Sequence, residues 1–305
     1  MWVHCLATRS ELMIAELNAL IQRPKDKLNL LCMYYKTFGN YTEVMRNAKK
    51  RNYPFEARLR NGKSMRIDKH GLTYFIVLYY SKLKVIDIND ETLQFEFDGR
   101  RLTIHGRNYA ALKTSFVDQD YDVLNVNSQT VIDVGANVGD TPIYFALRGA
   151  KRVIAFEPFP TLYYLAKRNV EENGLSDKIT LVNAGCGKDG TVRIKPDQQA
   201  NSGSKLVDQS EGIEIPTYSL NTIVEKFNVE DRSVLKVDCE GCEYDLIGNA
   251  SEDVLKKFNQ MIIEYHNGYS SLVRKLRGSG FRVKHTMPKR DKNFPAVGYI
   301  YAWRD

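Results

Sequence analysis

The feature that most constrains the fold is an alternation of short apolar strands and helices from about residue 129 onward. The predicted strands are 131–134, 151–156, 179–184, 234–237, 261–265, 281–284 and 298–303, and the predicted helices between the first three are 139–147 and 161–173. This alternation is typical of a parallel sheet covered by helices on both faces. The last two strands are joined by a short connection, which forbids a parallel crossover, so the last strand is expected to be antiparallel.

The first part of the chain has another pattern. Helices are predicted at 10–21, 28–35 and 42–50, followed by hairpins that turn at Asn61–Gly62 and Asp98–Gly99, dipeptides that suit tight hairpin turns. We therefore divide the chain into a small α+β region at 1–92 and a main domain at 93–305. The loop at 115–128 is the preferred place for a break between compact parts.

Composition excludes a disordered chain, since 43% of the 305 residues are hydrophobic and 27% are charged. The net charge of +7 resides mostly in residues 1–130, which carry 20 basic and 14 acidic side chains. The segment from Arg46 to Lys69 holds nine basic residues and two acids. It is interpreted either as a surface for a polyanion, such as RNA, an anionic lipid headgroup or a phosphorylated glycan, or as a solvated edge protected by charge.

Targeting signals are not evident. The longest uncharged apolar run, 72–80, is far short of the roughly 20 residues that a membrane-spanning helix needs, and no secretory signal is predicted at the start. The five cysteines are therefore expected to be reduced thiols in a cytoplasmic protein. Cys239 and Cys242 form one C-x-x-C pair, but a zinc site usually needs two such pairs, so no metal site is predicted.

A glycine turn follows the first strand of the alternation. The sequence runs from Asp133 through Gly135, Ala136, Asn137 and Gly139 into a helix. Gly135 permits a sharp turn close to a ligand, and Gly139 permits tight packing at the helix start. Asn137 stands where a dinucleotide fingerprint has its second glycine. The Asp133 carboxylate would repel a pyrophosphate and attract a ligand that carries an ammonium and a sulfonium.

Acidic residues follow three later strands of the sheet. Glu157 and Pro158 end the second strand, where a carboxylate can accept both hydroxyls of a ribose. Asp238, Glu240 and Glu243 end the 234–237 strand, and Glu264 and His266 end the 261–265 strand. Because carboxyl ends of parallel strands meet at one edge, these groups are expected to converge there, with His266 as a candidate general base.

These motifs resemble the FkbM-type S-adenosylmethionine-dependent methyltransferases. The matching stretches are D-V-G-A-N-V-G-D, F-E-P, K-V-D-C-E-G-C-E and I-E-Y-H, within about 93–303. The resemblance implies a Rossmann-like class I methyltransferase domain that uses S-adenosylmethionine and typically O-methylates a hydroxyl on a sugar, glycan or small molecule. In this reading the residues that bind the cofactor are Asp133, Gly135, Ala136, Asn137, Gly139, Glu157, Pro158, Asn183 and Ala184. Those at the reacting centre are Asp238, Glu240 and His266.

Three alternatives remain open at this point. The basic N-terminal segment would suit an RNA methyltransferase, although the strand ending at Asp238 lacks the N/D-P-P-Y/F motif that grips base amino groups. A non-catalytic nucleotide- or glycan-binding protein could keep the same fold, but pure binding does not require the acid cluster. An NAD-dependent oxidoreductase is disfavoured by Asn137.

Overall fold

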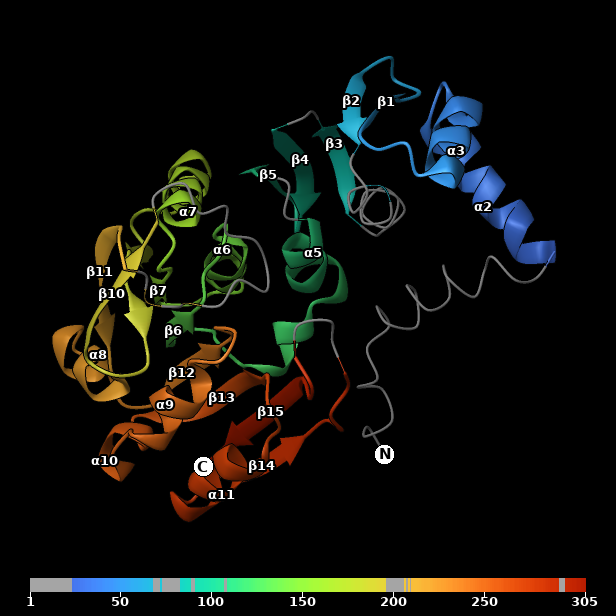
Figure 1. Ribbon diagram of the computed structural model, residues 1–305. Coiled ribbons are helices and arrows are strands. Elements are labelled where there is room, and N and C mark those ends of the chain that lie inside the picture. Colours follow the sequence, from blue (N-terminus) through green and yellow to red (C-terminus); the bar gives the residue numbers. More distant parts are fainter. Residues whose placement is uncertain are drawn as a thin grey trace. The chain divides into compact units, whose positions relative to one another are not determined.

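The computed structural model describes residues 24–67, 72, 83–88, 91–106, 109–195, 206, 208, 210–290 and 294–305 (Figure 1). The chain forms two compact units, Met1–Asp120 and Tyr121–Asp305. Their boundary falls inside the loop expected at 115–128, so the hairpin that we assigned to the 93–305 domain lies in the first unit. The helix predicted at 10–21 lies outside the described residues.

The first unit is α+β, as predicted. Its described elements are α2 (Pro24–Thr37), α3 (Tyr41–Lys50), β1 (Phe55–Arg58), β2 (Ser64–Ile67), β3 (Lys84–Ile88), β4 (Thr92–Phe97), β5 (Arg100–His105), α5 (Tyr109–Leu112) and the π-helix η1 (Lys113–Asp118). The turn at Asp98 and Gly99 has positive φ at both residues, as a type I′ turn requires. The β1–β2 hairpin instead closes through a loop at 59–63, where we predicted a two-residue turn.

The second unit contains the predicted seven-stranded sheet, in the order β14-β15-β13-β12-β6-β7-β8. The strands are β6 (Thr130–Val134), β7 (Arg152–Phe156), β8 (Ile179–Val182), β12 (Ser233–Val237), β13 (Phe258–Tyr265), β14 (Arg282–His285) and β15 (Gly298–Trp303). Strand β15 runs antiparallel to both of its neighbours, and the five strands from β13 to β8 are mutually parallel. The prediction of a mostly parallel Rossmann-like sheet with an antiparallel last strand is confirmed.

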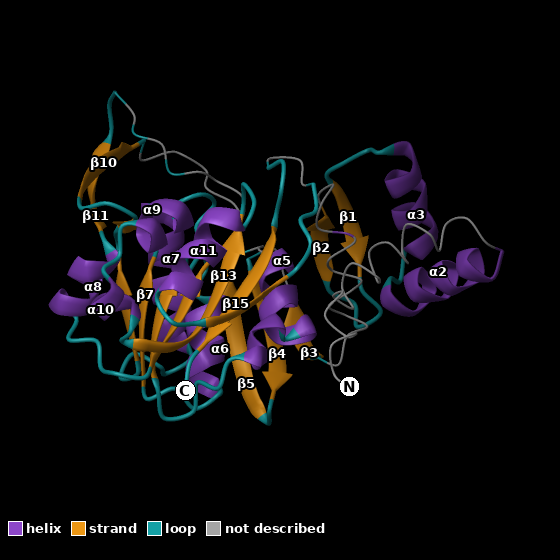
Figure 2. Ribbon diagram, turned by 90° about the horizontal axis from the view of Figure 1, so that it is seen from below, coloured by secondary structure: helices purple, strands orange, loops and turns teal. Residues whose placement is uncertain are grey.

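Helices pack on both faces of this sheet (Figure 2). They are η2 (Asp120–Val123), α6 (Asp140–Leu147), α7 (Pro160–Glu172), α8 (Leu220–Lys226), α9 (Glu243–Gly248), α10 (Glu252–Leu255) and α11 (Ser270–Gly278). The short strands β9 (Gly185–Cys186), β10 (Gly190–Ile194) and β11 (Ile213–Tyr218) form a separate three-stranded sheet.

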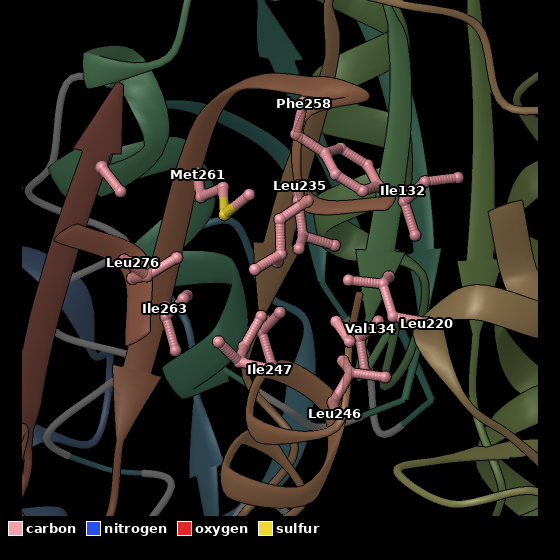
Figure 3. Packing of buried hydrophobic residues seen from close by; sticks show 14 of the residues in the cluster. Ile132, Val134, Leu220, Leu235, Leu246, Ile247, Phe258, Met261, Ile263 and Leu276 are labelled. Atoms are coloured by element: carbon pink, nitrogen blue, oxygen red, sulfur yellow. The ribbon is translucent and has the colours of Figure 1, made fainter. Parts of the chain in front are cut away.

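The main core lies between the sheet and helices α8 to α11 (Figure 3). Alternation along the strands sends Ile132 and Leu235 into this core, together with Leu246 of α9 and Leu276 of α11. The neighbouring residues of the same strands therefore point to the opposite face, where α6 packs. This alternation places Asp133 of β6 and Lys236 of β12 on the α6 side of the sheet.

Among the residues that the structure describes, no helix has both the length and the apolar character needed to span a membrane.

Candidate active site

The glycine turn connects β6 to α6 at the carboxyl edge of the sheet. Gly135, Asn137 and Gly139 all have positive φ, at 85°, 50° and 86°. The backbone N–H groups of Gly135 and of the buried Ala136 donate to the carbonyl of Phe156 at distances of 3.0 and 2.9 Å. The turn is therefore anchored to the end of β7, with an asparagine in a backbone region that favours glycine.

The turn also approaches the end of β12 closely. A Cβ atom built on Gly135 would lie 1.8 Å from the carbonyl oxygen of Asp238, so any side chain there would displace backbone. A Cβ on Gly139 would lie 3.1 Å from the Cα of Ala166 in α7, which explains the tight packing expected at that position.

Glu157, at the end of β7, holds the other side of the turn. Its Oε2 accepts from the N–H of Asn137 at 2.8 Å, and its Oε1 accepts from the N–H of Phe159 at 3.0 Å. Burial raises the pKa of Glu157 to about 7, although these two hydrogen bonds oppose the rise. Each carboxylate oxygen retains further acceptor capacity, which a ribose hydroxyl could use.

The predicted adenine-side residues lie after β8. The Asn183 side-chain amide donates to the carbonyls of Glu157 and Pro158 at 2.8 and 2.9 Å, which fixes the loop after β7. Ala184 is completely buried in the main core. Asn183 therefore shapes this edge through the Glu157–Pro158 loop, while Ala184 contributes packing.

Asp133 has a counter-ion that the sequence analysis did not assign. The buried ammonium of Lys236 in β12 lies 3.0 Å from Asp133 Oδ1, and the Thr141 hydroxyl donates to Asp133 Oδ2 at 2.5 Å. The signal was present, because Lys236 interrupts the apolar strand V-L-K-V next to the aspartate strand. We had treated Asp133 as an isolated negative charge, whereas the structure places it in an ion pair.

The acids at the ends of β12 and β13 converge as predicted, and His266 lies between two of them. His266 Nε2 is 3.2 Å from Glu240 Oε2, and His266 Nδ1 is 3.1 Å from Glu243 Oε1. Burial alone would lower the pKa of His266, but the hydrogen bonds to both glutamates outweigh burial and raise it to about 11. His266 is therefore an imidazolium at neutral pH, with a carboxylate beside each ring nitrogen.

Glu243 organises this part of the site, although the sequence analysis gave it no role. It is fully buried at the start of α9, and besides the imidazole it accepts from the N–H of Gly241 at 2.8 Å and from the N–H of His266 at 3.0 Å. One carboxylate thus links the loop after β12 to the end of β13. Glu240, between these contacts, has a positive φ of 58°, an uncommon and strained conformation for a glutamate.

Asp238 and Glu264 form a second carboxyl pair. Burial, together with the charge of the nearby Asp238, raises the pKa of Glu264 well above its usual value. Glu264 therefore favours its protonated form. Ligand atoms of Asp238, Glu264 and His266 lie within 4.8 Å of one another, a spacing that could hold a cation, but both imidazole nitrogens already face carboxylates.

The cysteine prediction was wrong for two of the five residues. Cys239 and Cys242 form a disulfide with a Cα–Cα distance of 5.5 Å, whereas we expected reduced thiols. The loop around Glu240 brings their side chains within bonding distance. Our prediction of reduced thiols came from the expected cellular compartment and did not consider the path of this loop. Cys32 and Cys186 are free thiols.

The comparisons with known proteins agree with this arrangement. A family model described as the methyltransferase FkbM domain matches residues 133–283, a stretch that includes the glycine turn and the whole acid cluster. These residues belong to the FkbM methyltransferase family. The resemblance seen in the sequence motifs is confirmed.

Relatives of this FkbM domain include other methyltransferases. The chain is similar to Methyltransferase 1 of Beauveria bassiana, with 22% identity over 58% of this chain and 82% of that one. It is also similar to the hexuronic acid methyltransferase AglP of Haloferax volcanii, with 26% identity over 53% of this chain and 67% of that one. A solved rRNA methylase from Streptococcus thermophilus covers 62% of this chain and 96% of its own, with 12% identity and a TM-score of 0.39.

Proposed function

We propose that this protein is an S-adenosylmethionine-dependent O-methyltransferase that modifies a hydroxyl group of a sugar, glycan or small molecule. The observation that supports this proposal most is the contact between the glycine turn and the acid cluster, where Gly135 packs directly on the Asp238 carbonyl. This contact would keep a methyl donor on the turn and a proton acceptor on β12 at adjacent positions.

The residues present fit the cofactor. The turn at 135–139 has the positive-φ backbone that close approach to a ligand requires, and Glu157 stands beside it with acceptor capacity for a ribose. The turn would hold the methionine part, Glu157 and Pro158 the ribose side, and Asn183 the edge beside the adenine. Bound S-adenosylmethionine supplies an electrophilic methyl group carried on a sulfonium.

The contacts of these groups favour Asp238 as the proton acceptor over His266, the base candidate of the sequence analysis, and over Glu240. As an imidazolium, His266 has no lone pair to offer, and Glu240 is one of its counter-ions. The raised pKa of Glu264 favours its protonated form, so Asp238 is the carboxylate at this place that we assign as the acceptor. As the bond from the acceptor oxygen to the methyl carbon forms and the bond to sulfur breaks, the hydroxyl proton passes to Asp238.

Similarity to the hexuronic acid methyltransferase AglP supports an acidic sugar as the first acceptor to test. The experiment incubates the enzyme with methyl-labelled S-adenosylmethionine and oligosaccharides that end in a hexuronic acid, with neutral oligosaccharides as controls. We expect label in a methyl ether, which resists mild alkali. Label released by mild alkali would indicate a methyl ester and would overturn hydroxyl methylation.

The base assignment is tested by Asp238→Asn beside His266→Gln. Removing a general base lowers turnover by about 10²–10⁴-fold, and Asp238→Asn should do so while S-adenosylhomocysteine still binds. His266→Gln should lower the free energy of unfolding as well as turnover. A larger loss of turnover in His266→Gln than in Asp238→Asn, with equal cofactor binding, would return the base role to His266.

RNA is the second candidate acceptor because the described part of the basic segment is exposed. Its exposed basic side chains are Arg46, Lys49, Lys50, Arg51, Arg58, Arg60, Lys63 and Arg66. The guanidinium of Arg60 also lies over the half-exposed ring of Tyr35, 4.3 Å from its centroid. Arginine and aromatic planes on which bases can stack are typical of proteins that bind single-stranded RNA.

A further inference from the structure

Lys236 is a buried charge for which the proposed reaction has no direct use. It lies in the middle of the sheet and is 1% exposed. A lysine in such a position is rare and costly unless its ammonium is paired and hydrogen-bonded. The partners that compensate for its burial should therefore indicate its role.

The ion-pair and hydrogen-bond partners of the Lys236 ammonium belong to the end of β6 and the turn that follows, and the ammonium also lies 6.0 Å from the centroid of the Tyr121 ring. Nζ lies 3.0 Å from Asp133 Oδ1, donates to the Gly135 carbonyl at 2.8 Å, and lies 3.3 Å from the Val134 carbonyl. Two of the three N–H donors of the ammonium thus have carbonyl acceptors, and its charge is paired with the Asp133 carboxylate. Burial alone would lower the pKa of Lys236, but the charges of Asp133 and Asp238 outweigh burial and raise the pKa above its usual value. The ammonium therefore stays protonated.

The Gly135 carbonyl lies beyond the paired part of β6, so it accepts a hydrogen bond from a side chain, Lys236. Strand β6 ends at Val134, where the pairing with β12 also ends, so Gly135 lies one residue beyond the ladder. On the other side of the turn, Phe156 and Glu157 of the β7 end accept from the N–H groups of Gly135 and Asn137. The glycine turn is therefore hydrogen-bonded on two sides. Lys236 of β12 donates to it on one side, and the end of β7 accepts from it on the other.

We propose that Lys236 is a positioning residue of the cofactor site, whose ammonium sets the glycine turn for the methyl donor by binding Asp133 and the Gly135 carbonyl together. This inference rests on the proposed use of S-adenosylmethionine. It assigns to Asp133 the role of counter-ion to Lys236, instead of direct attraction of the cofactor. It also couples the turn to Asp238, because Lys236 and Asp238 belong to the same strand end, two residues apart.

The test compares Lys236→Met with the double variant Asp133→Asn/Lys236→Met. The single variant leaves a buried carboxylate without its counter-ion, so it should be less stable and should bind S-adenosylhomocysteine at least about tenfold more weakly. The double variant removes both charges, which restores much of the stability that the single variant loses. It still lacks a donor for the Gly135 carbonyl, so its cofactor affinity should stay at least about tenfold below that of the wild type.

Calorimetry with S-adenosylhomocysteine and urea unfolding separate these outcomes. Lys151→Met is the matched control, because it removes a lysine whose ion pair with Glu230 is on the surface. It should retain wild-type affinity. In turnover assays, the double variant should show a raised KM for S-adenosylmethionine and an acceptor KM within about twofold of the wild type.

A double variant that folds and binds S-adenosylhomocysteine as tightly as the wild type would overturn the positioning role and leave Lys236 a structural residue. Wild-type protein that does not bind S-adenosylhomocysteine would instead overturn the proposed function. The two failures are therefore distinguishable. If Lys236→Met fails to fold, the double variant alone still decides the question.

Discussion

Replacing Glu243 by glutamine should reveal how strongly the loop after β12 and the end of β13 depend on one carboxylate. The carboxylate accepts from Gly241 N, His266 N and His266 Nδ1 at 2.8, 3.0 and 3.1 Å. A glutamine keeps the shape but has one acceptor oxygen, and its amide N–H₂ would face a donor on the other side. It also removes one of the two negative charges that flank the imidazolium.

The magnitude follows from these contacts. A hydrogen bond to a charged group contributes about 1.5–3 kcal/mol, and removing one partner of a buried ion pair costs about 3–5 kcal/mol. Because the contacts share one carboxylate and are not additive, we expect Glu243→Gln to lower the free energy of unfolding by about 3–5 kcal/mol near neutral pH. Glu252→Gln, which alters an exposed glutamate at the start of α10, should change it by less than about 0.5 kcal/mol.

The loss should depend on pH in a defined direction. The pKa of His266 is raised in the folded protein to about 11 from 6.5, so the stability linked to its charge is complete below 6.5 and disappears as pH rises through 11. Glu243→Gln lowers this pKa, so the difference in unfolding free energy between wild type and variant should narrow as pH approaches 11. Urea unfolding over a pH series provides the measurement. Equal stability of the two proteins, or a His266 imidazole that titrates in the wild type near 6.5, would refute the reasoning.

Three further perturbations test other parts of the structure. The pKa of Glu157 is raised in the folded protein from 4.5 to about 7, so the stability linked to its protonated form is lost as pH rises across this range. The free energy of unfolding of the wild type, relative to that of Glu157→Gln, should therefore fall between pH 4.5 and 7 and then stay constant. A gap that widens with pH would contradict this. Gly135→Ala should cost at least about 1–3 kcal/mol for its positive φ alone and should abolish S-adenosylhomocysteine binding in calorimetry, because its Cβ collides with the carbonyl of Asp238. Wild-type affinity in that variant would show that the turn can shift without harm. Reversing the charges of Lys49–Arg51 to glutamate should abolish any salt-sensitive binding of RNA or anionic vesicles and leave cofactor affinity unchanged; if the wild type binds neither at low salt, the solvated-surface interpretation holds.

The sequence predicts the second unit well because its information is local. Each strand is a short apolar run, and the carboxyl ends of parallel strands must meet at one edge, so the convergence of Asp238, Glu240 and His266 follows from periodicity and topology alone. The Asp98–Gly99 turn likewise follows from dipeptide preference.

The charge states could not be predicted in the same way, because they depend on contacts between distant elements. His266 looks like a general base until the Glu243 side chain at the start of α9 is known to lie against it. Asp133 looks like a free carboxylate until the register of β6 and β12 places Lys236 beside it. The Cys239–Cys242 disulfide depends on the path of one loop, whereas our inference came from cellular context.

The position of β15 also has a consequence for the order in which the protein is made. Strand β14 is synthesised before β15 but pairs with the sheet only through it, and β13 has β15 as its outer neighbour along the whole of Gln260–Tyr265. Until β15 leaves the ribosome, β13 presents an open edge and β14 has no strand to join. The pairing of the strand that carries Glu264 is therefore completed after the other strands of the sheet have been synthesised, when the first unit is already available to fold.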